Sequence, residues 1–454
     1  MAASQGGQGL NGPLAAFALI RQRNFGPYFA GNALSASGTW FQNLAAALLI
    51  YRLTHSAFLL GVLNFCQFAP VIALAAWAGS AADRYDRRRL LFATQTTASL
   101  LAATLAVLAW SGLASAWVVI VFALGLGVTS AISIPPQQAL IASLVDREEL
   151  PTAVALNSMT YNLARAVGPA LGAASVRYLG IPASFLLNAF SYFAFIAALL
   201  AIRPRVQETV APETSRLRDA LGLLREDPRL LAFLIVVAAV GFGSDPVNTL
   251  APAFAHAFNR KDTVAGFIIG AFGAGAVTAA LFVAGRVAGS RKRMAITLSL
   301  LGGGVIAFSL SPWLPLGFAI LFVAGFGYLA SNTSATTRLQ LGVSEAQRGR
   351  MMALWGVAFL GLRPLASLAD GAIASAAGVR AAGVILALPA LAGAVLLVLV
   401  GQRERGRKHR LVQPAAARTE AESEDGHGPA AGDRGRDVVA DHRASRARDP
   451  AEGD

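Results

Sequence analysis

The sequence predicts an all-helical membrane protein whose twelve transmembrane helices form two related six-helix bundles. Three observations support this fold class. Hydrophobic residues make up 55% of the 454 residues and charged residues only 14%, whereas soluble domains contain roughly 25% charged residues. Apolar stretches long enough to cross a bilayer recur through most of the chain, and weak matches relate its two halves. Most of the chain is therefore expected to lie in lipid.

The cysteine, histidine and charge content excludes several kinds of soluble function. The single cysteine, Cys66, rules out a disulfide framework, and the five histidines show no metal-ligand spacing. The formal net charge is +13, but residues 402–454 contain 11 basic and 11 acidic residues, so the whole excess lies in residues 1–401. Orientation in a membrane explains basic residues between apolar stretches better than nucleic-acid binding does. We expect no metal, no cofactor and no nucleic-acid partner.

Twelve apolar stretches define the expected spans. A transmembrane helix needs about 20 mostly apolar residues, and the breaks between these stretches are short and rich in Pro, Gly or charge. The expected spans are 24–51, 57–80, 90–112, 115–141, 152–178, 182–202, 229–254, 263–286, 294–311, 313–337, 350–377 and 379–401. The resulting segments are a flexible N-terminus (1–20), an N-terminal six-helix bundle (21–202), a cytoplasmic linker (203–228) with an amphipathic piece at 217–225, a C-terminal six-helix bundle (229–401) and a disordered cytoplasmic tail (402–454).

Basic residues set the expected orientation. If the N-terminus is cytoplasmic, the cytoplasmic loops contain 19 basic residues and the outer loops contain five, namely Arg52, Arg177, Arg260, Lys261 and Arg380. Cytoplasmic loops of membrane proteins are enriched in Lys and Arg. We therefore expect a multi-pass protein of the plasma (inner) membrane with both termini in the cytoplasm.

Weak matches at a shift of about 200 residues relate the halves. Residues 125–127 match 325–327, residues 38–43 match 243–248, and Arg165 matches Arg363. The shared order of these matches predicts a duplicated six-helix unit. Such repeats commonly form a substrate site at their interface, with access that alternates between the two sides of the membrane.

Two motifs resemble those of a known family. Residues 79–89, GSAADRYDRRR, resemble the major facilitator superfamily signature G-x-x-x-D-R-x-G-R-R-R between its second and third helices, with Asp86 in place of the last Gly. Residues 168–172, GPALG, are similar to the G-P-x-x-G antiporter motif of exporters in that superfamily. Over about residues 20–400 the chain is most similar to the secretion-effector, enterobactin-exporter-like branch.

The resemblance implies a gating role for the first motif, in which Asp83 reaches the start of span eleven and joins the halves when the cytoplasmic side is closed. The alternative is that the loop only orients the protein and contacts anionic lipid. That alternative explains the arginines but not Asp83, because acidic residues contribute little to topology. The candidate gating residues are Gly79, Asp83, Arg84, Arg87, Arg88 and Arg89.

The second motif predicts close helix packing. Ala164, Gly168 and Gly172 share one face along which helices can approach closely, and Pro169 removes a backbone donor and can bend the span. That the motif marks an exporter is implied by the resemblance alone.

Charged residues inside the spans are the strongest functional signal. Arg165 and Asp245 are expected near the middle of spans five and seven, and Arg363 and Asp370 share the polar face of span eleven. A charge at this depth costs about 2.5 to 3.5 kcal/mol on insertion scales, so each is expected to face a cavity or a partner. Asp245 either exchanges a proton as its neighbours change or is a fixed partner of Arg165 or Arg363, and the sequence supports both equally.

Uncharged polar residues in the spans extend this set. Each either lines a cavity or forms an interhelical hydrogen bond, worth about 0.6 kcal/mol on average. Together with Trp40 and Phe68 they predict a mixed pocket suited to an amphipathic organic molecule. The residues are Asn32, Gln42, Asn43, Gln67, Asn162 and Asn248.

These features predict a secondary transporter rather than an enzyme. The sequence has no phosphate-binding loop motif for an ATP-driven pump, and its intramembrane acidic residues are too sparse for a catalytic cluster. We expect a monomer that exports a drug, siderophore or metabolite in exchange for protons. An uptake permease of the same fold and a non-transporting receptor or scaffold are the alternatives, because composition does not set the direction of flux.

Overall fold

The computed structural model describes residues 13–204, 222–225, 227–283 and 290–399, and all regular elements within these residues are helical. The helices are α1 (Pro13–Ile20), α2 (Phe25–Thr54), α3 (Ala57–Ala73), α4 (Ala75–Arg84), α5 (Arg87–Trp110), α6 (Ala116–Leu144), α7 (Leu150–Tyr178), α8 (Ile181–Ala201), α10 (Pro228–Thr249), α11 (Ala251–Ala257), α12 (Val264–Val283), α13 (Arg291–Leu310), α14 (Leu314–Leu341), α15 (Glu345–Gly356), a π-helical segment (Val357–Gly361), α16 (Arg363–Ala377) and a last helix (Val379–Leu399).

Each predicted span corresponds to one helix or to consecutive helices. By length and apolar composition, however, fewer than twelve of them are able to cross a membrane. Among the described residues, nine helices are long and apolar enough to cross a membrane, or ten if the bent pair α3 and α4 is one span. The other two predicted spans correspond to α2 and α7, which are 30 and 29 residues long. These two helices carry most of the polar residues predicted in the first half, and their polarity explains why they miss the hydropathy criterion.

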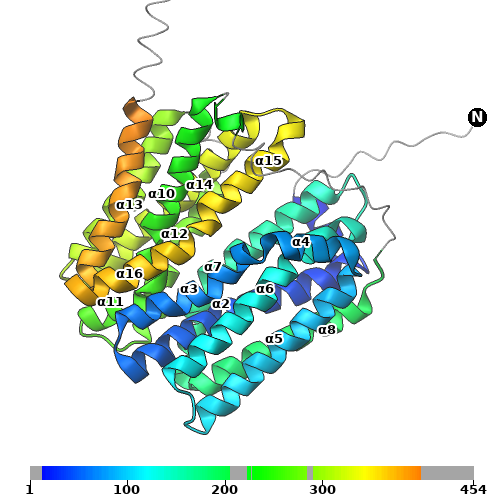
Figure 1. The fold of residues 1–454 in the computed structure, drawn as a ribbon, viewed down its shortest axis with the longest axis horizontal. Helices are drawn as coiled ribbons and strands as arrows, with labels where there is room; N and C mark the ends of the chain where they lie inside the picture. The colour runs from blue at the N-terminus through cyan, green and yellow to red at the C-terminus, as the bar shows by residue number, and fades with distance from the viewer. Residues whose placement is uncertain (1–12, 205–221, 226, 284–289, 400–454) are drawn as a thin grey trace, which may run out of the picture. The chain divides into compact units, whose positions relative to one another are not determined.

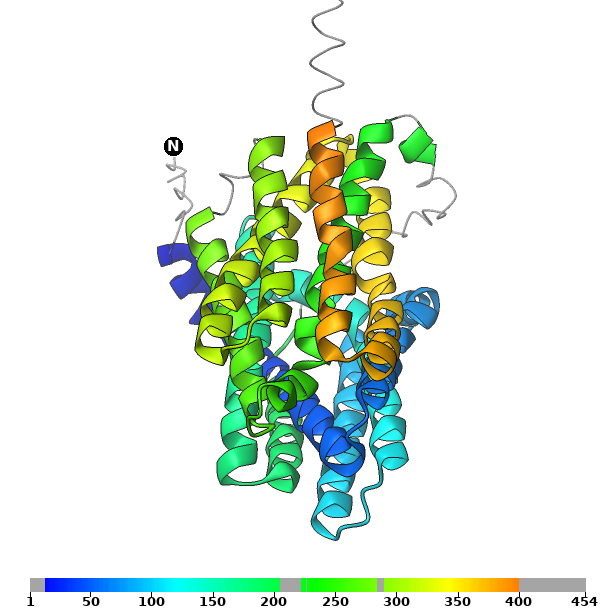
Figure 2. The same ribbon diagram turned by 90° about the vertical axis from the view of Figure 1, so that its left-hand side faces the viewer.

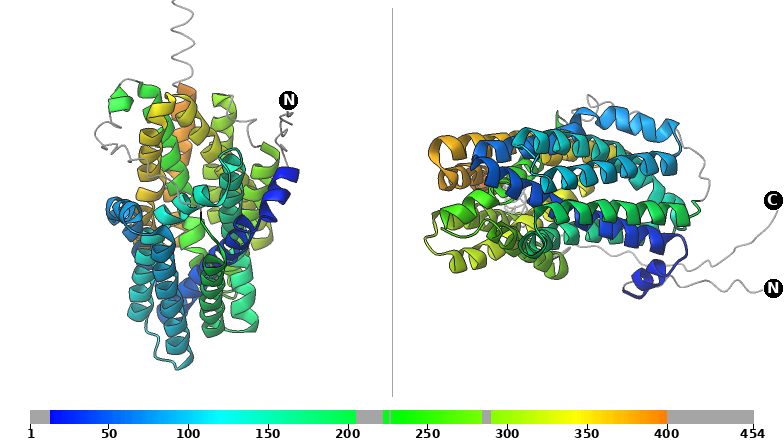
Figure 3. Two further views of the ribbon diagram at one scale, coloured as in Figure 1. Left: turned by 90° about the vertical axis from the view of Figure 1, so that its right-hand side faces the viewer. Right: turned by 90° about the horizontal axis from the view of Figure 1, so that it is seen from below.

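The helices pack in two groups. In the first, α2 packs against α7 and α8, and α5 and α3 pack against α6. In the second, α14 packs against α10, α12 and α13. Figure 1 shows these groups as the blue-to-green and the green-to-orange helices, and Figures 2 and 3 show the long helices of each group running alongside one another. The two groups meet where α3 packs on α16 and where α7 packs on α12.

Parts of the expected flanking segments differ from the prediction or lie outside the described residues. The N-terminus was expected to be flexible as far as residue 20, but residues 13–20 form α1. Leu19 of this helix is 2% exposed and belongs to a cluster with Tyr28 and Leu144, so burial of apolar surface stabilises the helix. Residues 1–12, most of the linker with its amphipathic piece, and the tail lie outside the described part of the chain.

Three spans are interrupted along their length. The axis bends by 53° between α3 and α4, and span seven breaks between α10 and α11. Span eleven passes through the π-helical segment directly before Arg363. Each break has a proline close by, Pro70, Pro252 and Pro364 respectively, and proline cannot donate the backbone hydrogen bond that a continuous α-helix requires.

Candidate functional site

Asp245 is the centre of a buried polar cluster between α10 and α16. Its carboxylate is paired with Arg363, whose Nε donates to Oδ1 at 3.3 Å. Its other oxygen, Oδ2, accepts from the Ser367 hydroxyl at 2.7 Å and from the Thr249 hydroxyl at 2.9 Å. Asp245 is 1% exposed, so these donors replace the water that the ionised carboxylate loses on burial.

Asp370 lies beside Asp245 but has no comparable support. It is completely buried and close enough to interact electrostatically with Asp245. Neither of its carboxyl oxygens accepts a hydrogen bond from any described residue. Arg363 therefore pairs with Asp245, and no described residue pairs with the neighbouring carboxyl group of Asp370.

The local chain path brings this cluster together. Asp245 precedes Pro246 near the end of α10, and Thr249 follows one turn later. Arg363 begins α16, with Ser367 and Asp370 one and two turns further along the same face. Opposite them, α3 approaches so closely that a Cβ on Gly61 would lie 2.4 Å from the carbonyl oxygen of Ser367 and 3.1 Å from Cα of Gly371.

Two arginines lie close to Trp40. The guanidinium carbons of Arg165 and Arg363 are each 5.9 Å from the centre of the Trp40 ring. Arg165 also stacks over Tyr328 at 4.6 Å, and Arg363 over Phe68 at 4.4 Å. Cation–π contacts of this kind position a guanidinium group without neutralising its charge.

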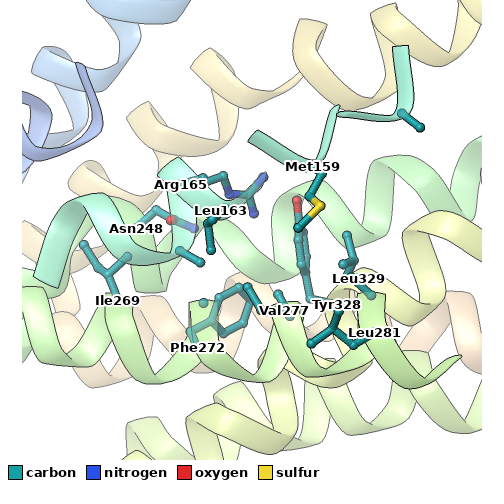
Figure 4. A pocket seen from close by; sticks show the side chains of 15 residues that line it. Met159, Leu163, Arg165, Asn248, Ile269, Phe272, Val277, Leu281, Tyr328 and Leu329 are labelled. Atoms are coloured by element: carbon teal, nitrogen blue, oxygen red, sulfur yellow. The ribbon is translucent and has the colours of Figure 1, made fainter. Parts of the chain in front are cut away.

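Arg165 borders a mostly apolar cavity of about 410 Å³ between α7, α12 and α14. Figure 4 shows Arg165 beside Asn248, with Leu163, Phe272 and Tyr328 around the same space. The cavity takes residues from both helix groups, so it lies at the junction that the repeat pattern predicted.

A second cavity, of about 230 Å³, lies within the first helix group and is lined by amides and hydroxyls. On its wall Gln137 Nε2 donates to Asn32 Oδ1 at 2.5 Å, and Asn32 Nδ2 donates to Asn157 Oδ1 at 2.8 Å. Gln67 and Asn43 form another amide pair there. Gln95 is 7% exposed, and its Oε1 has no hydrogen-bond partner among the described residues. Trp40 also lines this cavity, and its ring centre is 5.9 Å from the guanidinium carbon of Arg165, which lines the larger cavity.

The structure divides the predicted polar residues between cavity and packing roles. Asn32, Asn43 and Gln67 line the amide cavity, and Asn248 lines the apolar one while donating to the Ser244 carbonyl oxygen. Gln42 is not among the residues that line either cavity: it is 2% exposed and accepts from Asn188 of α8 at 2.6 Å, because its position on α2 faces the neighbouring helix. The side chain of Asn162 lies outside the described atoms.

Sequence inspection missed several residues that complete the site. Thr249 is four residues after Asp245, a spacing that places it on the same helix face, and this signal was available. Tyr328, Gln95 and Asn157 had no signal of this kind, because their roles depend on which helices become neighbours.

The first motif was expected to be a loop, but Asp83 lies in the last turn of α4, where it is solvent-exposed and forms no hydrogen bond or ion pair with a described residue. Asp86 has a structural role: its side chain accepts from the Arg89 backbone N–H at 2.7 Å and caps α5. Arg88 donates to the carbonyl oxygens of Leu199 at 2.5 Å and Leu200 at 2.9 Å, at the C-terminal end of α8. Arg84, Arg87 and Arg89 have at least part of their surface in solvent, and a Cβ on Gly79 would meet no atom within 4 Å.

The second motif lies against two helices. A Cβ on Gly168 would approach Cβ of Trp40 to 2.6 Å, and a Cβ on Gly172 would approach the backbone of Phe41 to 2.9 Å, so α7 is closely packed on α2. On another side, the carbonyl oxygen of Pro169 lies 2.5 Å from where a Cβ on Gly266 of α12 would be. The motif therefore contributes to contacts within the first helix group and between the groups.

Long apolar helices in two groups, with buried charges and cavities where the groups meet, define a multi-span membrane transporter. The chain belongs to the transmembrane secretion effector family of the major facilitator superfamily, whose sequence model matches residues 14–419.

Named relatives and solved structures agree with this family. The chain is 30% identical over 263 residues to the staphyloferrin A transporter of Staphylococcus aureus, a match that covers 56% of this chain and 65% of that relative. It is 27% identical over 403 residues to the enterobactin exporter EntS of Shigella boydii, covering 80% and 91% of the two chains. In structure it is similar to a bacterial homologue of the human lysosomal transporter Spinster in an inward-facing, occupied conformation, with a TM-score of 0.69, 13% identity and coverage of 87% and 98%. The nucleoside transporter NupG gives a TM-score of 0.63 at 12% identity, with coverage of 83% and 99%. These structural similarities concern the fold alone.

Proposed function

We propose that this protein is a monomeric carrier of the plasma (inner) membrane that exports a small amphipathic organic compound, such as a siderophore, in exchange for protons. The observation that carries the proposal is the cluster of Asp245, Arg363 and Asp370, buried where the two helix groups meet. Buried intramembrane charges are expensive and mark transport pathways more often than structural contacts. The names of the relatives support export of organic compounds.

Within this proposal, Asp370 holds the proton in the state described here. Asp245 has a counter-ion and two hydroxyl donors, which compensate for its loss of water on burial. An ionised Asp370 would be a second negative charge without a donor in an apolar interior. A shift of Arg363 toward Asp370 would allow Asp370 to release its proton on the other side. The Ser367 and Thr249 hydroxyls would still donate to the Asp245 carboxylate, so that Asp245 does not take this proton up and the pair loses one proton in total.

The contacts between the helix groups support a state closed at the end predicted to be outside. Arg52 pairs with Asp262 there, and α3 touches α16 through Gly61 and Gly371. Asp83, at the end predicted to be cytoplasmic, is exposed. The positive-inside pattern places both termini on the cytoplasmic side.

Purified protein in liposomes under an imposed pH gradient tests the proposal. Efflux of a siderophore-like compound that follows the gradient and collapses with an uncoupler is the expected result. Flux that does not depend on the pH gradient would show that transport is not coupled to protons. Flux in the uptake direction would identify a permease. Absence of flux for a panel of siderophores, dyes and antibiotics would favour a receptor or scaffold.

A further inference from the structure

We infer that Arg165 is the anchor for an oxyanion of the transported compound, and that this compound is an amphipathic monoanion with a flat apolar part and neutral polar groups. The inference rests on the proposed function, since it concerns the substrate of the same site. It follows from the charges, the aromatic groups and the two cavities around Arg165.

The charge of Arg165 is not neutralised by the described part of the chain. Arg363 is paired with Asp245, whereas Arg165 forms no hydrogen bond or ion pair with any described residue. Arginine stays protonated in proteins, so the cavity retains one positive charge. The described residues that line the two cavities include Arg165 and no acidic residue. A cationic ligand would find no counter-charge on these walls, and an anionic one would find a single counter-charge.

The aromatic neighbours of Arg165 leave its hydrogen-bonding groups available. The guanidinium carbon lies 5.9 Å from the centre of the Trp40 ring and 4.6 Å from that of Tyr328, and no N–H group of Arg165 donates a hydrogen bond to a described residue. The five N–H donors lie in the guanidinium plane and match two oxygens of a carboxylate or a catecholate. Arg165 is thus held beside the two rings, and its N–H groups can donate two parallel hydrogen bonds to an oxyanion of the ligand.

The linings of the two cavities predict that the rest of the ligand has an apolar part and a more polar part. The larger, about 410 Å³, is walled mainly by Leu163, Ile269, Phe272 and Leu329 and fits a flat hydrocarbon or aromatic group. The smaller, about 230 Å³, has a mixed lining of amide and hydroxyl residues together with Phe68 and Val71. Within the described part of the chain Gln95 Oε1 accepts no hydrogen bond, so it can accept one from a donor group of the ligand. Trp40 lines the smaller cavity and Arg165 lines the larger one, and the guanidinium carbon of Arg165 is 5.9 Å from the centre of the Trp40 ring. One molecule that contacts both side chains would therefore reach both cavities.

The charge of the ligand also affects the direction of its transport. A monoanion moves outward down an inside-negative membrane potential. A site that selects one negative charge is therefore suited to export even without a contribution from the pH gradient.

A series of three molecules that share one scaffold tests the site in the full-length protein, reconstituted in nanodiscs of zwitterionic lipid. The probes are 2-naphthoxyacetate, its neutral amide and the cationic 2-(2-naphthoxy)ethylammonium, with affinity measured by calorimetry. A charge-assisted contact predicts that the acid binds roughly 10-fold to 100-fold more tightly than the amide, and that the cation binds weakest. Equal affinities of the three probes, or no binding by any of them, would overturn the inference. This experiment uses the unaltered protein, so its outcome does not depend on whether a variant folds.

Variants then assign the preference to one side chain. Arg165→Gln should abolish the preference for the acid, Arg165→Lys should retain part of it, and Arg177→Gln should leave it unchanged, since Arg177 lies at the end of the same helix and stacks on Tyr178 instead. Survival of the full preference in Arg165→Gln would refute the assignment. Displacement of the probe by added phosphatidylglycerol, dependent on Arg165, would reassign the site to a lipid headgroup.

Flux measurements separate this inference from the proposed function. Binding of the acid without transport would keep the anion site and reject the carrier. Transport of only neutral or cationic compounds would keep the carrier and reject the anion site.

Discussion

Arg52, near the end of α2, and Asp262, two residues before α12, form an ion pair that joins the two helix groups. Arg52 Nη2 donates to Asp262 Oδ1 at 3.1 Å, and Arg52 Nε contacts the other carboxylate oxygen. The side chains are 44% and 21% exposed, so water and salt screen their attraction. Exposed pairs of this kind contribute about 0.2 to 1 kcal/mol, which biases an equilibrium between two states without fixing it.

Removal of this pair should shift the conformational equilibrium modestly. Ala36 lines the cavity of about 230 Å³, so a cysteine placed there reports on access to this cavity. In a Cys66→Ser background with this reporter, Arg52→Gln should raise the rate of alkylation from the outside by at most about fivefold. The charge-reversed double variant Arg52→Asp with Asp262→Arg should restore the original rate. An unrestored rate in the double variant would show that attraction between the two charges is not the cause.

The contact between α3 and α16 should tolerate no added side-chain volume. Because a Cβ on Gly61 would lie 2.4 Å from the Ser367 carbonyl oxygen, Gly61→Ala must separate the two helices, and overpacking typically costs about 1 to 3 kcal/mol. We expect faster outside alkylation of the same reporter and slower transport. Gly303→Ala is the matched control, since no atom lies within 4 Å of its added Cβ. Equal behaviour of the two variants would contradict the packing seen here.

The two buried aspartates should respond differently to replacement by asparagine. Asp245→Asn leaves Arg363 buried without its counter-ion, and breaking a buried pair in this way typically destabilises a protein by about 3 to 5 kcal/mol. Asp370→Asn removes a carboxyl group that has no hydrogen-bond donor among the described residues, so thermal unfolding should occur at the same temperature or higher. Flux in Asp370→Asn should lose its dependence on the pH gradient. A gradient-dependent flux in a stable Asp370→Asn protein would assign the proton elsewhere.

Two aspartates three residues apart in the first motif should have separate roles. Asp83→Asn should reduce transport at unchanged membrane abundance and thermal stability, because Asp83 is exposed and contacts no described residue in this state. Asp86→Ala should instead lower stability by about 1 kcal/mol through loss of the α5 cap. Flux and thermal unfolding measured on both variants test this contrast. Normal transport by Asp83→Asn at equal abundance would leave only a topological role for the loop.

The sequence was sufficient for the fold class because the bilayer imposes a simple length and polarity requirement on every span. It also located Asp245 and Arg363 as functional candidates, since charges within an apolar stretch stand out. It was less informative for amides: Asn32 and Gln42 have the same chemistry on the same helix, yet one lines a cavity and the other bonds to Asn188. Side-chain type does not encode which neighbour a helix face will meet.

The sequence by itself determined that the chain is a multi-span membrane protein with rare charges in its spans, because hydropathy and charge are properties of each residue and need no partner. Only the tertiary structure decided that Arg363 pairs with Asp245, that no residue of the described ranges donates to Asp370, and that Arg165 lines a cavity. Those pairings depend on how α10, α16, α7 and α14 pack, and packing arises from contacts between residues that are far apart in the chain.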